Sequence, residues 1–201
     1  MKSEPLTLGI VQCALGGSRE ENLARVEGLV REAAGRLPRG AARPAPAPTV
    51  KAPVRADAAP GNWPEEVIVH IDGGSRGNPG EAGVGVYFQD RSGAPLQSIA
   101  RYIGRATNNT AEYQALLVAL ARAREAGVRH LRVYSDSELL VNQVNGRYRT
   151  TVPHLQQFLQ EAIRLMREIG RVDGSHVRRE QNKEADALAN EAMDNRSSWP
   201  A

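Results

Sequence analysis

The hydrophobic positions between residues 65 and 197 form alternating strand-like and helix-like stretches. The pattern predicts five strands, at 67–71, 83–88, 96–103, 131–134 and 171–177, of which the first is rich in β-branched residues. Helical spacing of apolar residues predicts four helices, at 110–126, 138–145, 153–169 and 183–194. Short connections between the first three strands favour antiparallel pairing, and the later helical connections favour parallel pairing. The sequence therefore predicts an α/β domain with a mixed five-stranded sheet flanked by helices.

The first 64 residues follow a different pattern. An apolar run at 6–12 predicts a strand and the spacing over 18–34 predicts a helix, which together make a strand–helix segment at 1–35. This segment resembles the N-terminal start of the carbon–nitrogen hydrolase (nitrilase) superfamily. One strand and one helix cannot bury a core, so we assign it no activity and leave open whether it docks, is vestigial or reflects a mistaken gene start. Residues 36–64, rich in Pro, Ala and Arg, predict an extended linker before a domain at 65–197.

Composition and charge narrow the functional classes. The chain has 201 residues and a single cysteine, Cys13, which excludes an intramolecular disulfide framework and a cysteine-based zinc site. Its apolar runs are too short for a membrane-spanning helix, and its first residues do not resemble a secretory signal. We therefore expect a cytoplasmic protein that does not contact a membrane. The net charge of +3 is concentrated before residue 65, where it favours either solubility or a weak, salt-sensitive tether for nucleic acid.

Four carboxylates occupy positions where sheets present active sites. Asp72 follows the first predicted strand and Asp136 follows the fourth, while Glu112 and Asp186 fall in the first turns of predicted helices. Each alone has an ordinary explanation, as a turn residue or as compensation of a helix dipole. Together at the carboxyl ends of parallel strands, they would raise one another's pKa unless a cation were present. Oxygen ligands without His or Cys favour Mg²⁺ or Mn²⁺.

Four short motifs carry a family resemblance. The stretches at 72–80, 107–113, 134–137 and 182–189 resemble the type 1 ribonuclease H family, and they occur in that family's order. The resemblance covers about residues 65–195. It implies a ribonuclease H-like fold and a metal-dependent endonuclease that hydrolyses the RNA strand of RNA–DNA hybrids, with 3′-hydroxyl and 5′-phosphate products.

The resemblance also implies the metal ligands. Asp72 would contact both of two Mg²⁺ or Mn²⁺ ions. Glu112 and Asp136 would serve the ion on the side of the nucleophile, and Asp186 the ion on the side of the leaving group. Such an arrangement activates water without a side-chain nucleophile.

The resemblance further places substrate-binding residues around these acids. These are Gly73, Ser75, Asn78 and Asn108 near the RNA sugars, and Asn109 near the DNA strand. The 2′-hydroxyl that such residues recognise distinguishes RNA from DNA. Alternatives stay open, because either Asn108 or Asn109 can cap the predicted helix and Asn78 suits a turn.

Two departures from the family pattern concern binding of the hybrid and catalysis. The loop at 145–152 is too short for the basic protrusion of some members, so Arg147, Tyr148 and Arg149 form either a small phosphate contact or a solvated loop. Some members carry a mobile histidine before the last acid. Here residues 177–182 resemble the compact-loop branch of the family, which implies Arg179 rather than His176 as the assisting residue.

Two further assignments complete the sequence-based hypothesis. We assign His70 a structural role on the strand face opposite Asp72. We expect a monomer. The alternatives are a hybrid- or RNA-binding adaptor with the same fold, or a related nuclease acting on another nucleic acid. Four mutually repelling acids argue against the adaptor.

Overall fold

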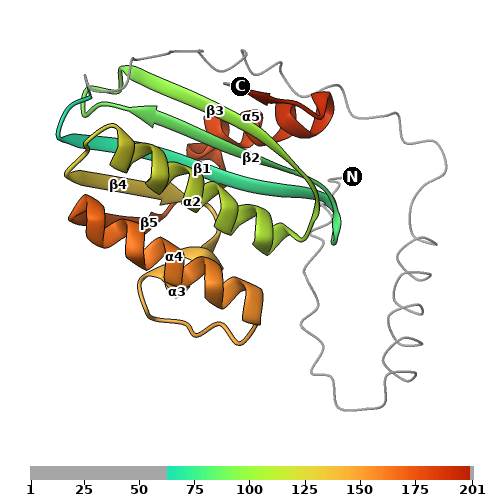
Figure 1. The fold of residues 1–201 in the computed structure, drawn as a ribbon. Coiled ribbons are helices and arrows are strands. Elements are labelled where there is room, and N and C mark those ends of the chain that lie inside the picture. Colours follow the sequence, from blue (N-terminus) through green and yellow to red (C-terminus); the bar gives the residue numbers. More distant parts are fainter. Residues whose placement is uncertain (1–62, 200–201) are drawn as a thin grey trace, which may run out of the picture. The chain divides into compact units, whose positions relative to one another are not determined.

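The computed structural model describes residues 63–199, so the predictions for 1–35 and 36–62 lie outside the described part. The predicted order of five strands and four helices is confirmed (Figure 1). In chain order the elements are β1 (Glu66–Gly77), β2 (Gly80–Gln89), β3 (Pro95–Ala106), α2 (Asn108–Glu125), β4 (His130–Ser135), α3 (Glu138–Val144), α4 (Pro153–Ile169), β5 (Arg171–His176), the 3-10 turn η1 (Arg179–Gln181), α5 (Lys183–Asn195) and β6 (Ser198–Trp199).

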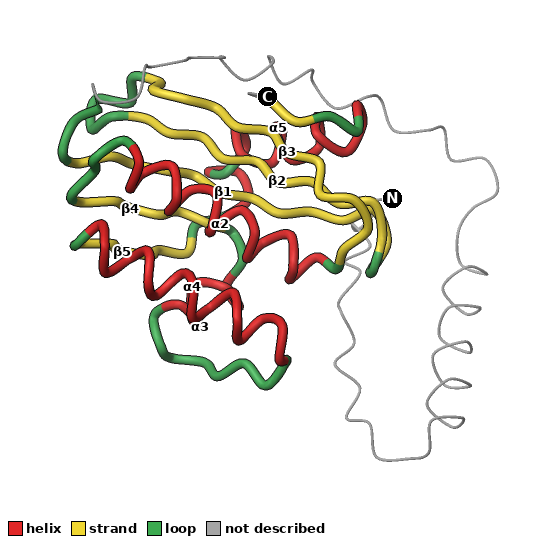
Figure 2. The backbone as a smooth tube through the Cα atoms, in the orientation of Figure 1, coloured by secondary structure: helices red, strands yellow, loops and turns green. Residues whose placement is uncertain are grey.

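The strands form one mixed sheet in the order β5-β4-β1-β2-β3-β6 (Figure 2). The pairs β1–β2, β2–β3 and β3–β6 are antiparallel, and β1–β4 and β4–β5 are parallel. The edge strand β6 was not predicted, because its two residues are too few to show an alternating pattern. Helices α2 and α4 lie on one face of the sheet and α5 on the other (Figure 1).

Strand β1 is longer than predicted. The apolar pattern stops at Ile71, but antiparallel pairing with β2 continues to the pair Gly77↔Gly80. The expectation that Asp72 ends the strand was therefore wrong, because glycine-rich sequence can pair through its backbone without an apolar pattern. Parallel pairing with β4 does end at Ile71↔Ser135, just before Asp72.

Two glycines let helices approach the sheet closely. A Cβ on Gly73 would lie 2.2 Å from the carbonyl carbon of Ala111 in α2, and one on Gly85 would lie 2.0 Å from the carbonyl oxygen of Ala185 in α5. Real Cβ atoms do not come this near to backbone, so both helices need glycine beneath them. The two contacts bring the start of α2 and the start of α5 to neighbouring positions on β1 and β2, since Gly73 pairs with Val84 and Gly85 with Asp72.

Helix α2 begins earlier than predicted. The Thr107 side chain caps it by accepting a hydrogen bond from the Thr110 backbone at 3.3 Å. The expectation that Asn108 or Asn109 caps this helix was wrong, since both lie inside it. Thr107 has the extended backbone that a cap requires, which explains the shift.

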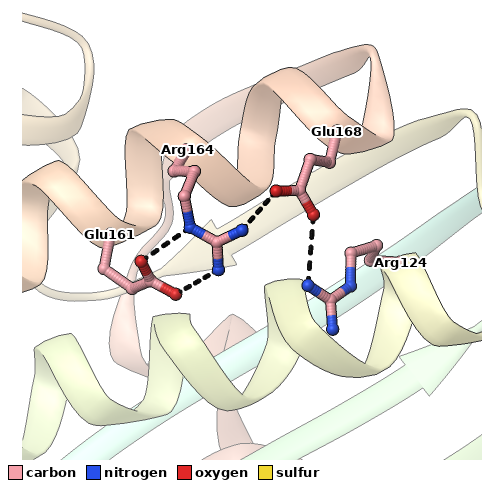
Figure 3. A network of polar contacts seen from close by, with 4 residues as sticks. All are labelled: Arg124, Glu161, Arg164 and Glu168. Atoms are coloured by element: carbon pink, nitrogen blue, oxygen red, sulfur yellow. Dashed lines mark hydrogen bonds and ion pairs between the residues drawn. The ribbon is translucent and has the colours of Figure 1, made fainter.

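Helices α2 and α4 pack through the apolar core, and an ion-pair network joins their surfaces (Figure 3). In this network Arg124 contacts Glu168 at 3.1 Å, and Arg164 contacts both Glu161 and Glu168. These side chains are substantially exposed, so the network stabilises the fold little. Nearer the start of α2, the Tyr113 hydroxyl donates a 2.8 Å hydrogen bond to Gln143 and ties α2 to α3.

The described part begins with a packed aromatic residue. The Trp63 ring lies 4.7 Å from that of Phe88, and the Arg122 guanidinium lies 5.0 Å from the centre of the Trp63 ring. The domain boundary at residue 65 stays a prediction, with this contact just outside it. Across residues 63–199, no helix combines the length and apolar character needed to cross a membrane.

Candidate active site

The candidate site lies where the parallel pair β1–β4 ends. Asp72 and Asp136 are the next residues after the last pair, Ile71↔Ser135, as the sequence predicted. One carboxylate oxygen from each of Asp72, Asp136 and Glu112 lies within 4.8 Å of the others. Three acids, one on β1, one directly after β4 and one on α2, thus converge at one point.

Glu112 reaches this point from α2. Because α2 begins at Asn108, two residues before the predicted start, the expectation that Glu112 lies in the first turn of the helix was wrong. Its side chain is buried and accepts a hydrogen bond from the Gly73 backbone. Its second oxygen, Oε2, is also buried and has no hydrogen-bond partner among the described residues. Gly73 therefore serves this site twice, by admitting α2 and by donating to Glu112.

Asp186 and Arg179 close the opposite side of the site. Asp186 lies in the first turn of α5, as predicted, where Arg179 forms an ion pair with it and Asn190 donates to it at 3.2 Å. All four predicted acids line one open cavity of about 400 Å³. Its wall comprises Asp72, Gly73, Gly74, Ser75, Arg76, Asn108, Glu112, Asp136, Ser137, Arg179, Asp186, Asn190 and Met193.

The acids raise one another's pKa. Burial, followed by the charges of Asp136 and Asp186, raises the pKa of Asp72 to about 7, against the opposing effect of Arg179. Burial and the neighbouring charges of Asp72 and Asp136 also raise the pKa of Glu112 well above its usual range. A bound cation would offset both effects. The all-oxygen donors and the unpartnered Glu112 oxygen fit a hard divalent cation.

The predicted substrate-binding residues are only partly brought together. Gly73, Ser75 and Asn108 line the cavity, and the Ser75 hydroxyl has no hydrogen-bond partner within the described part. Asn78 accepts a 3.2 Å hydrogen bond from the Asn108 backbone, which joins the β1–β2 turn to α2. Asn109 lies on α2 but does not line the cavity.

The two candidates for an assisting residue lie in different places. Arg179 lines the acidic cavity and pairs with Asp186. His176 ends β5 and lines a separate cavity with Glu138 and Arg147. Of the two, Arg179 therefore lies beside the acids, and its assisting role stays a prediction of the sequence.

Asn182 is a site residue to which sequence reasoning assigned no role. It is fully buried, and its Nδ2 donates to the Ile71 carbonyl at 2.9 Å and to Asp136 Oδ1 at 3.0 Å. In sequence it resembles an ordinary cap of α5, yet its side chain makes no capping hydrogen bond. Only the fold reveals its contact with Asp136, 46 residues away in sequence.

His70 lies behind the acids. Residues two apart on a strand face the same side, so placing His70 opposite Asp72 was wrong. Burial lowers the pKa of His70, while the charge of Glu184 and the side chain of Asn182 raise it. The imidazole therefore lies on the α5 side of the sheet, beside Asn182.

Comparison with known proteins adds family relationships. A family model described as "Reverse transcriptase-like" matches residues 70–192. The chain is 42% identical over 131 residues to a bifunctional protein of Mycobacterium tuberculosis, covering 64% of this chain and 36% of that protein. It is 41% identical over 128 residues to ribonuclease HI of Halobacterium salinarum, covering 64% of each. The chain thus spans about a third of the mycobacterial relative and just under two thirds of the archaeal one.

Solved structures show the same relationship. The N-terminal RNase H domain of the Mycobacterium tuberculosis protein matches with a TM-score of 0.63 and 40% identity, over 65% of this chain and 94% of that one. RNase H1 of Halobacterium salinarum matches with a TM-score of 0.63 and 40% identity, over 65% and 98%. LC11-RNase H1 in complex with an RNA/DNA hybrid matches with a TM-score of 0.63 and 38% identity, over 65% and 98%.

Proposed function

This chain belongs to the reverse transcriptase-like ribonuclease H family, and from that premise we propose that it is a metal-dependent endonuclease that hydrolyses the RNA strand of RNA–DNA hybrids. The observation that carries the proposal is the cluster of Asp72, Glu112 and Asp136, whose oxygens lie within 4.8 Å of one another. Mutually repelling buried acids are costly to a fold, and a bound cation gives them a use.

The proposal assigns Mg²⁺ or Mn²⁺ to these acids. Asp72 would hold two ions, Glu112 and Asp136 one of them, and Asp186 the other. When bound, two such ions supply a nucleophilic water and stabilisation of the leaving 3′ oxygen, which gives 3′-hydroxyl and 5′-phosphate ends. Carboxylate ligands without nitrogen or sulfur support this choice over zinc.

The remaining wall of the cavity would recognise the substrate. Ser75 presents a buried hydroxyl that lacks a partner in the described structure, and Asn108 on α2 lines the same cavity. Both suit contact with a ribose 2′-hydroxyl, which donates and accepts hydrogen bonds. Arg179 would balance negative charge beside Asp186, where the phosphate backbone must approach. Contacts with Asn78 and Asn109, a monomeric state and a cytoplasmic location stay predictions of the sequence.

The substrate is tested with one RNA strand presented in several forms. The full chain is incubated with Mg²⁺ or Mn²⁺ and a 5′-labelled RNA that is single-stranded, paired with DNA or paired with RNA, beside a DNA duplex of the same sequence. We expect internal cuts in the hybrid alone, with 3′-hydroxyl ends. Hybrid binding without cuts would replace the enzyme with an adaptor, and preferential cutting of another substrate would replace it with a different nuclease.

A further inference from the structure

We propose that His70 and Asn182 form a positioning pair behind the acids. In this pair, His70 fixes the Asn182 amide, and Asn182 in turn fixes the carboxylate of Asp136. The inference rests on the proposed function in one respect, since it treats Asp136 as a cation ligand. Neither residue would touch the cation or the substrate.

Asn182 connects several parts of the site at once. Its Nδ2 donates at 2.9 Å to the Ile71 carbonyl, directly before Asp72, and at 3.0 Å to Asp136 Oδ1. Its own carbonyl accepts a 3.0 Å hydrogen bond from the backbone of Asp186. One fully buried residue therefore links the segments that carry three of the four acids.

The contacts of Nδ2 determine which way the amide must face. Both of its hydrogen bonds go to oxygen acceptors, so a flipped amide would place Oδ1 against two other oxygens. Flipping would remove both hydrogen bonds and add repulsion beside Asp136. The orientation of this amide thus matters to the orientation of the carboxylate.

Two buried atoms without a hydrogen-bond partner indicate how the orientation of the Asn182 side-chain amide can be fixed. Asn182 Oδ1 and His70 Nδ1 are both buried, and neither has a hydrogen-bond partner among residues 63–199. Asn182 lies next to His70 in the folded chain, because its Nδ2 donates at 2.9 Å to the carbonyl of Ile71, the residue directly after His70. In agreement with this contact, the Asn182 side chain raises the pKa of His70. An imidazole with its proton on Nδ1 would donate to Oδ1 and satisfy both atoms, which buried polar groups strongly favour. This hydrogen bond would oppose flipping of the amide.

A purely structural role makes a different prediction. If His70 only fills space against the Tyr134 ring, 5.2 Å away, its replacement should change stability and leave cation binding alone. If it positions Asp136 through Asn182, loss of the donor should weaken cation binding in protein that remains folded. Residues that orient metal ligands typically affect metal affinity by about 10–100-fold.

The test uses two substitutions of His70 in the full chain. His70→Asn places an amide nitrogen near the position of Nδ1 and keeps the donor, whereas His70→Leu removes it. Mn²⁺ binding is measured by calorimetry without nucleic acid, and thermal unfolding is measured without cation. We expect His70→Leu to weaken Mn²⁺ binding by about 10-fold and His70→Asn to stay within about twofold of wild type. Tyr134→Leu controls for lost packing and should bind Mn²⁺ as wild type does.

Two results would overturn the proposal. One is wild-type Mn²⁺ binding by folded His70→Leu, and the other is equal weakening by His70→Asn and His70→Leu. If His70→Leu does not fold, His70→Gln takes its place, because its amide nitrogen mimics Nε2 instead and should not restore binding. Mn²⁺ binding is read without substrate, so failure of hybrid cleavage would overturn the proposed function without deciding this inference.

Hybrid kinetics give a second readout. A residue that acts through Asp136 should lower kcat in His70→Leu by about the same factor as it lowers Mn²⁺ affinity, with KM for the hybrid unchanged. A rise in KM with unchanged kcat would instead assign His70 to substrate binding and contradict the positioning role.

Discussion

The two ends of strands β1, β4 and β5 place acids in opposite electrical environments. At the end where these strands begin, Arg132 contacts Glu66 at 2.8 Å, and His130 contacts Asp173 at 2.7 Å. At the end where β1 and β4 stop pairing, three acids instead converge on one another.

The pKa values record this difference. The hydrogen bond from His130, aided by the charge of Arg171, lowers the pKa of Asp173, whereas burial and neighbouring acids raise the pKa of Asp72 to about 7. At the first end, acidic side chains lie beside basic ones, which favours the folded state. The second is arranged against the stability of the fold, which is typical of a functional site.

Removing divalent cations should affect only the end where the acids cluster, and the resulting loss of hybrid cleavage is the largest effect we expect. Excess EDTA should lower the rate of hybrid cleavage by more than about 1,000-fold, because the water and the leaving oxygen lose their activation. The circular dichroism spectrum should stay unchanged, since the ion pairs of Glu66 and Asp173 need no cation. Added Mg²⁺ or Mn²⁺ should restore the rate. Cleavage that persists in EDTA would show that the reaction needs no divalent metal ion.

Replacing a carboxylate by an amide should stabilise the fold where the acids cluster and should not stabilise it where an acid is paired with basic side chains. Because the folded state raises the pKa of Asp72, the wild-type protein without cation should lose stability as the pH rises from about 4 to about 7. Asp72→Asn should then raise its free energy of unfolding at pH 8 by about 2 kcal/mol. Urea unfolding at pH 4 and pH 8 measures this difference, which should shrink at pH 4. Asp173→Asn should show no such gain at pH 8, and equal gains by both variants would refute the contrast.

The guanidinium group of Arg179, which lies beside the acids, should contribute less to the rate than the divalent cations do. Arg179→Ala should lower kcat for the hybrid by about 10-fold, because it removes the positive charge paired with Asp186. The neighbouring Arg178→Ala serves as the matched control and should change kcat by less than about twofold. Equal losses in the two variants would show a general effect of basic charge, and a larger loss in His176→Ala would reverse our choice of assisting residue.

The exposed network on α4 should give the smallest effect. Arg164→Ala removes the contacts to Glu161 and Glu168 (Figure 3). Solvent screens these contacts, so the unfolding midpoint should shift by no more than about 1–2 °C. Differential scanning calorimetry measures this shift. A drop much larger than that of a core substitution such as Leu165→Ala would show that surface pairing, not packing, holds α4.

Sequence patterns predict the elements best where apolar spacing and end signals agree. Helix α4 has the predicted bounds, because Pro153 suits its first turn, Gly170 ends it, and Leu155, Ala162 and Leu165 mark its buried face. The continuation of β1 past Ile71 has no apolar pattern, so it depends on pairing with β2. The sequence could not show that pairing register.

The residues of the candidate site, too, could be predicted from the sequence only in part. The four acids stand in recognisable motifs, and the structure brings all of them to one cavity. Asn182 stands in one of those motifs too, but its role depends on a contact with Ile71 across 111 residues and on complete burial. Both are properties of the folded chain. The sequence could therefore indicate which residues gather, and the structure was needed to show what holds them.

The most direct test compares one acid from each end in a single assay. Wild type, Asp72→Asn and Asp173→Asn are incubated with a 5′-labelled RNA–DNA hybrid and Mg²⁺, after circular dichroism shows that all three are folded. We expect internal RNA cuts by wild type and Asp173→Asn at similar rates, and a loss of more than about 1,000-fold in Asp72→Asn. Cleavage by Asp72→Asn at the wild-type rate, or equal loss in both variants, would contradict the assignment of catalysis to the unpaired acids.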